Sequence, residues 1–427
     1  MPKKKGKKGK KGKKGKGGEP IITTNRILAE RARCMCPRFG DAYYRTEKAD
    51  NIKSDVANYR IQKVAQKNID TLDLSGCSFA FLPDELRQLP AVVNNLVDLN
   101  LARNQLFNTD AVFMVLKSLK NLKRLSLANN FLNGKLSEDA GYLSNLEELD
   151  LDGNQLTALN NSCGNWSGMR VFTANSNMLT AVPVAAEHWT SLEMLSLRDN
   201  KIAELPPGSD KWLGMKRLMI GGNKFTALPP AVPLMLELRE LDVRKNEIPE
   251  IPAALTACVK METLNFGENK LTSLPEDLIG QFTELRELYL YRNKLESLPG
   301  DIGTLGSLEK LSISKNNLKA LPENVGELAS LQELYVNNNA KFNSLPASVG
   351  RLSMLREMSL RGCPKLKSIP NAVSSCELLK ELDLRSGAKK DTCKVPQDIV
   401  EALEKQRCSV RGAVVKKAKG GKKGKKK

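Results

Sequence analysis

The stretch Leu285-Arg-Glu-Leu-Tyr-Leu-Tyr-Arg-Asn293 decides the fold of this chain. Its apolar residues stand at Leu285, Leu288 and Leu290, and an asparagine closes it. The same nine-residue word returns every 23 or 24 residues on either side, closing on Asn246, Asn269, Asn316 and Asn339. A recurrence at a fixed period of about 20–29 residues is typical of a solenoid, in which each repeat is one turn of a coil.

The spacing inside the word predicts a β-strand with one buried face. Leu288 and Leu290 are two residues apart, which is the period of a strand, so both side chains point to the same side. We expect that side to be the interior of the coil. The residues between the leucines then point outward, and successive turns place these outward residues in columns along the coil.

The word resembles the repeat of the intracellular leucine-rich-repeat family. A second word, Leu298-Pro-Gly-Asp-Ile302-Gly-Thr-Leu305, resembles the Ras-group, Ras-suppressor-like and scaffold-type members. In that second word we expect Pro to stop the strand ladder and Gly to ease a tight turn. Cys77 and Cys363 occupy the closing position in two turns. The resemblance implies an internal ladder in which closing asparagines bond backbone groups: Asn104, Asn130, Asn154, Asn177, Asn200, Asn223, Asn246, Asn269, Asn293, Asn316 and Asn339.

The predicted fold class is α/β, a leucine-rich-repeat solenoid shaped as a curved parallel-sheet horseshoe. About fourteen repeats run from the one at Leu74 to the one at Leu384. The turn with Met169, Phe172 and Ala174 gives the weakest strand pattern. The expected organisation is a disordered Lys/Gly-rich tail (1–18), a helical N-terminal cap (19–68), the solenoid (69–390), a C-terminal capping helix (391–412) and a second disordered tail (413–427).

The two caps are predicted from apolar spacing and helix signals. One N-terminal helix would run through Ile27, Leu28 and Ala32, and a second would start at Ser54. The apolar stripe of the second helix would contain Val56, Tyr59, Ile61 and Val64. Residues 92–95 look like an insertion between the first two turns. Residues 395–403 read as the C-terminal capping helix.

The net charge of +19 comes from the two ends of the chain. Residues 1–18 contain ten Lys and residues 413–427 contain eight, without an acidic residue in either segment. The other 49 basic residues and all 48 acidic residues lie in 19–412, where they nearly balance. Such tails suit a polyanion (RNA, acidic tubulin tails or anionic lipid), nuclear import, or a non-specific solubilising role.

The nine Cys are scattered and odd in number, which favours a reducing compartment. The sequence has no apolar run long enough for a membrane span and no secretory-signal pattern. We therefore expect a cytoplasmic protein, with the cilium or axoneme and the nucleus as alternatives.

Catalytic, metal and cofactor sites find no support in the sequence. The single His, His188, cannot form a Ser-His-Asp relay, and the isolated Cys34-Met-Cys36 lacks partners at zinc spacing. The pair Gly221 and Gly222 indicates small outward residues rather than a nucleotide site. Tryptophans recur every 23 residues in a column that holds Leu in other turns, so we expect core packing rather than an aromatic platform: Trp166, Trp189 and Trp212.

The outward strand face is the predicted partner site, because no sequence element is available to cover it. Tyr and Arg are enriched at interface hot spots. The predicted residues are Arg198, Arg244, Tyr289, Tyr291, Arg292, Tyr335, Asn337, Arg361 and Arg385. Among them we expect exposed Tyr289, Tyr291 and Tyr335 to form a cluster flanked by Arg244, Arg292 and Arg361, the alternative being an ordinary solvated strand face.

An acidic block in turn four is a second candidate. Glu147, Glu148, Asp150 and Asp152 lie beside Lys123 and Arg124. The block could recognise a basic segment, including one of this chain's own tails, or it could be a charge-balanced surface.

The function predicted from the sequence is a monomeric, non-enzymatic adaptor or scaffold in intracellular signalling, which binds a protein partner on its concave face. The alternative is a component of a cytoskeletal or ribonucleoprotein assembly that is recruited through the basic tails. The resemblance adds small GTPases or a phosphatase as possible associates; no residue in the sequence shows either.

Overall fold

The structure is a computed structural model that describes residues 47–276, 279–387 and 393–416. The chain divides into two compact units, residues 1–53 and 54–427. In the first unit only residues 47–53 are described, and they form the start of helix α3 (Glu47–Lys67). The first predicted N-terminal helix, the predicted tail 1–18, residues 417–427 of the second predicted tail, Cys34 and Cys36 lie outside the described residues.

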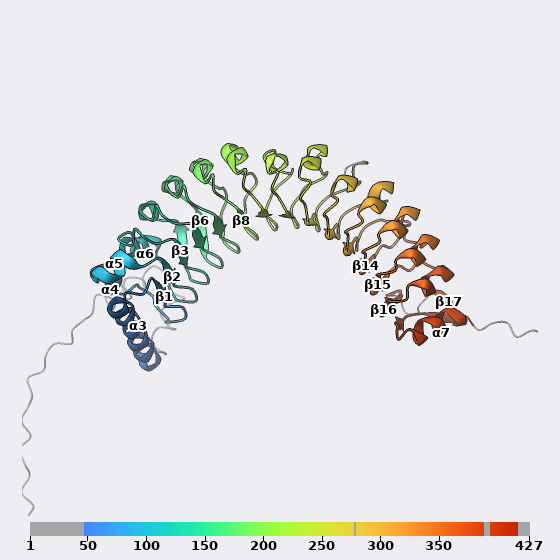
Figure 1. Cartoon of the computed structure of the whole chain (residues 1–427), viewed down its shortest axis with the longest axis horizontal. Coiled ribbons are helices and arrows are strands. Elements are labelled where there is room, and N and C mark those ends of the chain that lie inside the picture. Colours follow the sequence, from blue (N-terminus) through green and yellow to red (C-terminus); the bar gives the residue numbers. More distant parts are fainter. Residues whose placement is uncertain (1–46, 277–278, 388–392, 417–427) are drawn as a thin grey trace, which may run out of the picture. The chain divides into compact units, whose positions relative to one another are not determined.

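A single parallel sheet of 15 strands runs through the second unit and confirms the predicted solenoid (Figure 1). All its strands have three residues, and each pairs with the next turn. In sheet order they are β1 (Thr71–Asp73), β2 (Asp98–Asn100), β3 (Arg124–Ser126), β5 (Glu148–Asp150), β7 (Val171–Thr173), β8 (Met194–Ser196), β9 (Arg217–Met219), β10 (Glu240–Asp242), β11 (Thr263–Asn265), β12 (Glu287–Tyr289), β13 (Lys310–Ser312), β14 (Glu333–Tyr335), β15 (Glu357–Ser359), β16 (Glu381–Asp383) and β18 (Ser409–Arg411).

The register follows the sequence word from turn to turn. Leu264 in β11 aligns with Leu288 in β12, and Leu288 aligns with Leu311 in β13. The weakest predicted strand also forms, because Phe172 in β7 aligns with Leu195 in β8. One buried residue per strand thus adds to a continuous core along the coil.

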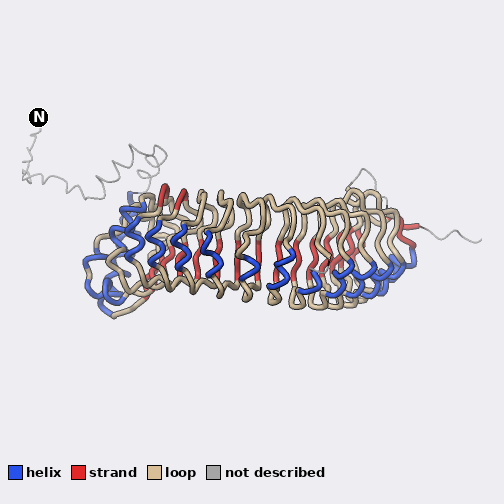
Figure 2. Tube along the Cα trace, turned by 90° about the horizontal axis from the view of Figure 1, so that it is seen from above, coloured by secondary structure: helices blue, strands red, loops and turns tan. Residues whose placement is uncertain are grey.

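Short 3₁₀ helices occupy the opposite, convex side of the coil (Figures 1 and 2). Strands lie about 4.8 Å apart, and the bulkier helical turns lie outside them, so the coil curves toward its sheet. The 3₁₀ helices are η2 (Glu138–Tyr142), η3 (Asn161–Asn165), η4 (Val184–His188), η5 (Pro207–Lys211), η6 (Val232–Leu234), η7 (Ala253–Ala257), η8 (Ile279–Gln281), η9 (Gly300–Thr304), η10 (Glu323–Glu327), η11 (Ala347–Arg351) and η12 (Asn371–Ser375).

The glycine of the second word has a different role from the one predicted. Gly303, Gly326 and Gly350 do not adopt the left-handed backbone conformation for which a tight turn would need a glycine. A Cβ atom at Gly326 would instead come within 2.3 Å of the Ser348 carbonyl oxygen in the next turn. These glycines therefore let neighbouring 3₁₀ helices pack closely.

The first turns are irregular, as their longer spacing suggests. They carry true α-helices on the convex side: α4 (Glu85–Gln88), α5 (Pro90–Asn95) and α6 (Thr109–Leu116). Helix α5 contains the residues predicted as an insertion and buries Val92. Strands β4 (Asn133–Lys135) and β6 (Gln155–Ala158) form a separate two-stranded sheet.

The two ends of the sheet are covered. Helix α3 buries Ala57, Ile61 and Val64 in the solenoid core, whereas the predicted stripe residues Val56 and Tyr59 are 42% and 66% exposed. The prediction is confirmed for Ile61 and Val64 and wrong for Val56 and Tyr59, because the helix turns Ala57 rather than Val56 inward.

At the other end the chain forms four elements: β17 (Lys394–Pro396), α7 (Gln397–Lys405), β18 and β19 (Val414–Lys416). Strand β19 lies in the segment 413–427 that was predicted to be disordered. Helix α7 buries Ile399 and Leu403. Strand β18 extends the main sheet beyond the fourteen predicted repeats, and β19 pairs with β17. The segment 391–412 is therefore a helix with an added fifteenth strand.

The tryptophan column is core, as predicted. Trp166, Trp189 and Trp212 are fully buried. Each indole donates to a carbonyl of the preceding turn, for example Trp189 Nε1 to Cys163 O at 2.8 Å. The rings of Trp166 and Trp189 stack with centroids 6.0 Å apart.

Candidate protein-binding face

The concave side of the second unit is a strand surface with no helix or loop over it among the described residues (Figures 1 and 2). Buried leucines alternate there with half-buried or exposed polar residues. The nine predicted partner residues all occupy these half-buried or exposed positions. They extend from β8 to β16, eight strand steps or roughly 40 Å, so they are too widely spread to form one cluster.

Behind the face, the closing asparagines hold the strand ends in place. Asn293 Nδ2 donates to Phe266 O at 2.9 Å and to Leu290 O at 3.1 Å, and Asn293 Oδ1 accepts the Leu271 N–H at 3.0 Å. The same three-part contact recurs in the other ten turns, at Asn104, Asn130, Asn154, Asn177, Asn200, Asn223, Asn246, Asn269, Asn316 and Asn339. In one turn where Cys replaces Asn, Cys363 Sγ lies 3.5 Å from Val336 O.

Tyr289 and Tyr335 are half-buried, contrary to the expectation that they are exposed. The Tyr335 hydroxyl lies 2.9 Å from Glu357 and 3.1 Å from Glu333, and the Tyr289 hydroxyl donates to Glu287 at 2.9 Å. Because both hydroxyl groups are occupied by glutamates, only the ring faces of Tyr289 and Tyr335 remain available to a partner. Burial, and then the hydrogen bonds to these carboxylates, raises the pKa of both phenols.

A lysine, rather than the predicted arginines, lies between the two tyrosines. Lys310 Nζ is 5.9 Å from the Tyr289 ring centroid and 5.5 Å from that of Tyr335, and it pairs with Glu333 at 2.7 Å. Lys310 and the glutamates were not among the predicted partner residues. Their position in the repeat could have identified them, because each is the first residue of its strand.

Most of the predicted arginines are already paired. Arg198 binds Asp242 at 2.7 Å, Arg244 lies 3.5 Å from the same carboxylate, and Arg292 binds Glu268 at 2.9 Å. Arg385 Nε donates to Asp383 at 2.9 Å. Burial acts to raise the pKa of Asp383, but the hydrogen bonds and the charge of Arg385 outweigh it, so this pKa is lowered. Tyr291 lies against Gly267, where a Cβ atom would come within 2.5 Å of the ring.

The acidic block of turn four is largely satisfied within the protein. Glu147 pairs with Lys123 at 2.7 Å, a contact that lowers the pKa of Glu147. Asp150 accepts hydroxyl hydrogen bonds from Ser126 and Thr173. Asp152 accepts from Asn175 at 2.6 and 2.9 Å, while burial raises its pKa. Arg124 turns away to Asp98 at 2.8 Å. These contacts favour the charge-balanced alternative.

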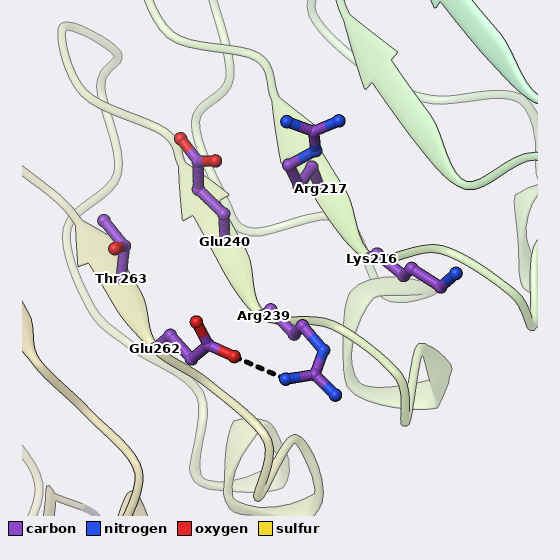
Figure 3. A pocket seen from close by; sticks show the side chains of 6 residues that line it. All are labelled: Lys216, Arg217, Arg239, Glu240, Glu262 and Thr263. Atoms are coloured by element: carbon purple, nitrogen blue, oxygen red, sulfur yellow. Dashed lines mark hydrogen bonds and ion pairs between the residues drawn. The ribbon is translucent and has the colours of Figure 1, made fainter.

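A shallow hollow of about 230 Å³ lies over β9–β11 on the concave side (Figure 3). It is lined by Lys216, Arg217, Arg239, Glu240, Glu262 and Thr263. Arg239 and Glu262 form an ion pair across it. Gly221 and Gly222, in the turn that follows β9, make room for Arg244 and Asp199.

Among the residues that the structure describes, no group of three or more His, Cys, Asp or Glu could hold a metal ion. The seven described Cys are buried and form no disulfide bond with one another. Burial raises the pKa of the Cys163 thiol to about 12 and that of Cys258 to about 11. These thiols therefore stay protonated and unreactive at neutral pH. No helix in the described part of the chain is long and apolar enough to cross a membrane.

Three family models match the chain. The model of a leucine-rich repeat region matches residues 277–410, and a leucine-rich-repeat model matches residues 237–295. A third, also of a leucine-rich repeat, matches residues 68–89 and 145–166. The comparison with curated proteins returns no match.

Solved structures with the same architecture come from bacteria and plants. A leucine-rich-repeat protein of Leptospira interrogans is 26% identical, with a TM-score of 0.64, over 82% of this chain and 97% of that one. An internalin of Listeria monocytogenes is 19% identical, with a TM-score of 0.65, over 76% and 93%. The Arabidopsis receptor kinase HAESA, in complex with a peptide hormone and a co-receptor, is 20% identical, with a TM-score of 0.60, over 82% and 71%.

Proposed function

We propose that this chain, a leucine-rich-repeat protein, is a non-enzymatic adaptor that binds one protein partner on its concave face. Leucine-rich repeats are commonly used for protein–protein interaction, and the adaptor role is the specific form proposed here. The signalling context, the cytoplasmic location and the monomeric state are parts of the same proposal.

One observation carries the proposal. Parallel sheets are normally covered on both faces, yet over the described residues of this unit only the convex side of the sheet is covered. The face that is left combines aromatic rings at Tyr289 and Tyr335 with arginines, the residue types that dominate interface hot spots. Such a surface suits a protein partner better than a small molecule, because it is broad and the hollow over β9–β11 is shallow.

The cysteines support the proposed compartment. The described Cys side chains are buried as small apolar residues, and none forms a disulfide bond with another described Cys. A reducing environment keeps such thiols free. This supports a cytoplasmic location and fits an intracellular signalling role.

The alternative proposal is an assembly component that is recruited by its tails. It is supported by the segregation of charge, since the excess positive charge of the chain lies in residues 1–18 and 413–427. Lysine tracts without aromatic residues bind polyanions without reading their sequence.

Capture of partners from native lysate separates the two proposals. The full chain is compared with the Tyr289→Ala/Tyr335→Ala variant and with a control, Tyr59→Ala/Tyr142→Ala, which removes two exposed tyrosines away from the concave strands. The adaptor proposal expects the concave variant to lose a partner that the control retains. An identical set of captured proteins from all three chains would contradict it.

A fourth sample, residues 19–416, removes the tails and keeps strand β19. Partners that persist with this chain at low and moderate salt support the adaptor. If they are lost without the tails but retained by the tyrosine variant, the assembly proposal holds instead.

A further inference from the structure

Two cations on the concave face lack the carboxylate partners that their counterparts have. Lys245 pairs with Asp199 at 3.1 Å, and Arg292 pairs with Glu268 at 2.9 Å. Lys315, at the equivalent position one turn after Arg292, is exposed and has no carboxylate within ion-pair distance among the described residues. Arg361, two turns further on, is likewise exposed and without such a partner.

The turn between those of Lys315 and Arg361 supplies no carboxylate that could pair with these cations. It presents the neutral amide of Asn338 at the position where other turns supply Asp199 and Glu268, and a second amide, Asn337, precedes it. Backbone bonds hold the three strand ends together: Lys315 N to Asn337 O at 2.6 Å, and Asn338 N to Arg361 O at 2.7 Å. Adjacent turns of the sheet thus present a cation, an amide and a second cation.

The amide between the cations has an unmet hydrogen bond. Asn337 Oδ1 is buried and has no hydrogen-bond partner in the structure. Buried polar atoms are nearly always paired, so a donor would be stabilising here once the amide of the half-buried Asn337 turns its oxygen outward. Tyr335 precedes Asn337 by two residues on the same strand and therefore shares its face. Its hydroxyl is engaged by Glu333 and Glu357, so its ring is what a ligand would contact.

We propose that Lys315, Asn337, Arg361 and the Tyr335 ring form a docking site for an acidic segment of the protein partner. This inference rests on the proposed function and specifies the chemistry of the partner. Strands β13 and β15 are two steps apart, so the cations are separated by about 10 Å. An extended segment rises about 3.3 Å per residue and points every second side chain to the same side. Carboxylates two residues apart therefore both face the sheet, about 7 Å apart, which the long Lys and Arg side chains can reach, and a backbone N–H between them can approach Asn337.

A protein segment fits this surface better than a nucleic acid does. Glu333 and Glu357 stand on the same strands as Asn337 and Arg361, close to the Tyr335 ring. Their charges would repel a phosphodiester chain, which carries a negative charge at every residue. A peptide can place its two carboxylates on the cations and neutral residues beside the glutamates.

The test measures fluorescence anisotropy with a labelled hexapeptide, Leu-Glu-Ala-Glu-Ala-Leu, and with its glutamine counterpart. The full chain is titrated, and so is the Lys315→Gln/Arg361→Gln variant. The matched control is Lys245→Gln/Arg198→Gln, which removes one cation from the column of Lys315 and one from the column of Arg361, both of them paired in the folded chain. Since every variant keeps the Lys-rich tails, binding of the probe to the tails is equal in all samples.

We expect the Lys315/Arg361 variant to bind the acidic probe about five- to tenfold more weakly than the control variant does. Asn337→Asp, which supplies the missing carboxylate, should weaken binding to a similar extent. Equal binding by the two double variants, or equal binding of the glutamine peptide, would overturn the proposal. So would a single-stranded RNA oligonucleotide whose binding depends on Lys315 and Arg361 when that of the peptide does not.

The result is separable from the capture experiment. Loss of a captured partner through the tyrosine variant, without any dependence of the probe on Lys315 and Arg361, leaves the adaptor standing and removes the acidic site. If the probe binds more weakly to the Lys315/Arg361 variant while capture by the tyrosine variant is unchanged, the acidic site stands and the adaptor proposal in its tyrosine-dependent form is contradicted.

Discussion

At the scale of single residues, the closing asparagine does the most for the coil. Each strand ends after three residues, and the chain must then turn inside a closely packed interior. One amide side chain serves two carbonyls and one N–H at that point, as Asn293 does for Phe266, Leu290 and Leu271. Buried backbone groups need such partners wherever the strand ladder ends.

Replacing Asn293 with Ala should therefore lower the free energy of unfolding by about 1–3 kcal/mol, because it leaves buried carbonyls and an N–H unpaired. Urea unfolding followed by circular dichroism measures the change. Asn343→Ala is the control, since Asn343 is exposed. A shared unfolding midpoint for the two variants would contradict the structural role of the ladder.

The half-buried tyrosines predict a dependence of stability on pH. Burial, and next the hydrogen bond to Glu357, raises the pKa of Tyr335 above its ordinary value of about 10. The folded chain then holds this proton more tightly than the unfolded chain does. Its contribution to stability is present below pH 10 and is lost as the pH rises toward the folded pKa.

Tyr335→Phe should flatten the fall in unfolding free energy between about pH 9 and 11, as measured by urea unfolding at each pH. Tyr142→Phe, at a tyrosine that is 58% exposed, should leave that fall unchanged. The same slope in both variants would show that Tyr335 has no special link between folding and its proton.

At the scale of the element, the convex helices depend on glycine for close packing. Neighbouring 3₁₀ helices approach so closely that a methyl group at Gly326 would meet the Ser348 carbonyl oxygen and Cβ within 2.3–2.6 Å. Nothing lies within 4 Å of a Cβ at Gly300, which starts helix η9. Both glycines belong to 3₁₀ helices, but only Gly300 has room for a methyl group.

Gly326→Ala should destabilise the protein by about 1–3 kcal/mol through overpacking, whereas Gly300→Ala should be nearly neutral. Thermal unfolding of both variants provides the comparison. A Gly326→Ala variant as stable as Gly300→Ala would show that the convex side adjusts freely.

The strands could be predicted from the sequence and the convex elements could not. A strand word has a fixed local period, and the weak turn at Phe172 still pairs in register because its neighbours on both sides do. The convex segments are set by the space that the next turn leaves. For this reason α5 was not foreseen, and Val56 was predicted to be buried in α3 where Ala57 is. Strand β18, at the end of the main sheet, is the one strand of that sheet that was not predicted.

At the scale of the whole molecule, charge is segregated by sequence position. Removing residues 1–18 and 417–427 takes away seventeen Lys and no acidic residue. The remaining chain, residues 19–416, keeps its 48 acidic and 50 basic residues.

This truncated chain should elute from a heparin column at much lower salt than the full chain, because fewer counterions are released on binding. Its unfolding midpoint should not change, which serves as the control for an intact solenoid. Retention equal to that of the full chain would place the polyanion-binding surface on the solenoid.

The sequence by itself determined the repeat, the strand register, the core columns and the positions of the ladder asparagines. These follow from a word that is local and recurs at a nearly constant period. Only the tertiary structure decided which outward charges are compensated, since partners come from other turns, as with Lys245 and Asp199, 46 residues apart. In the folded chain Arg292 is paired with Glu268, and Lys310 lies between Tyr289 and Tyr335. Lys315 and Arg361 have no ion pair among the described residues.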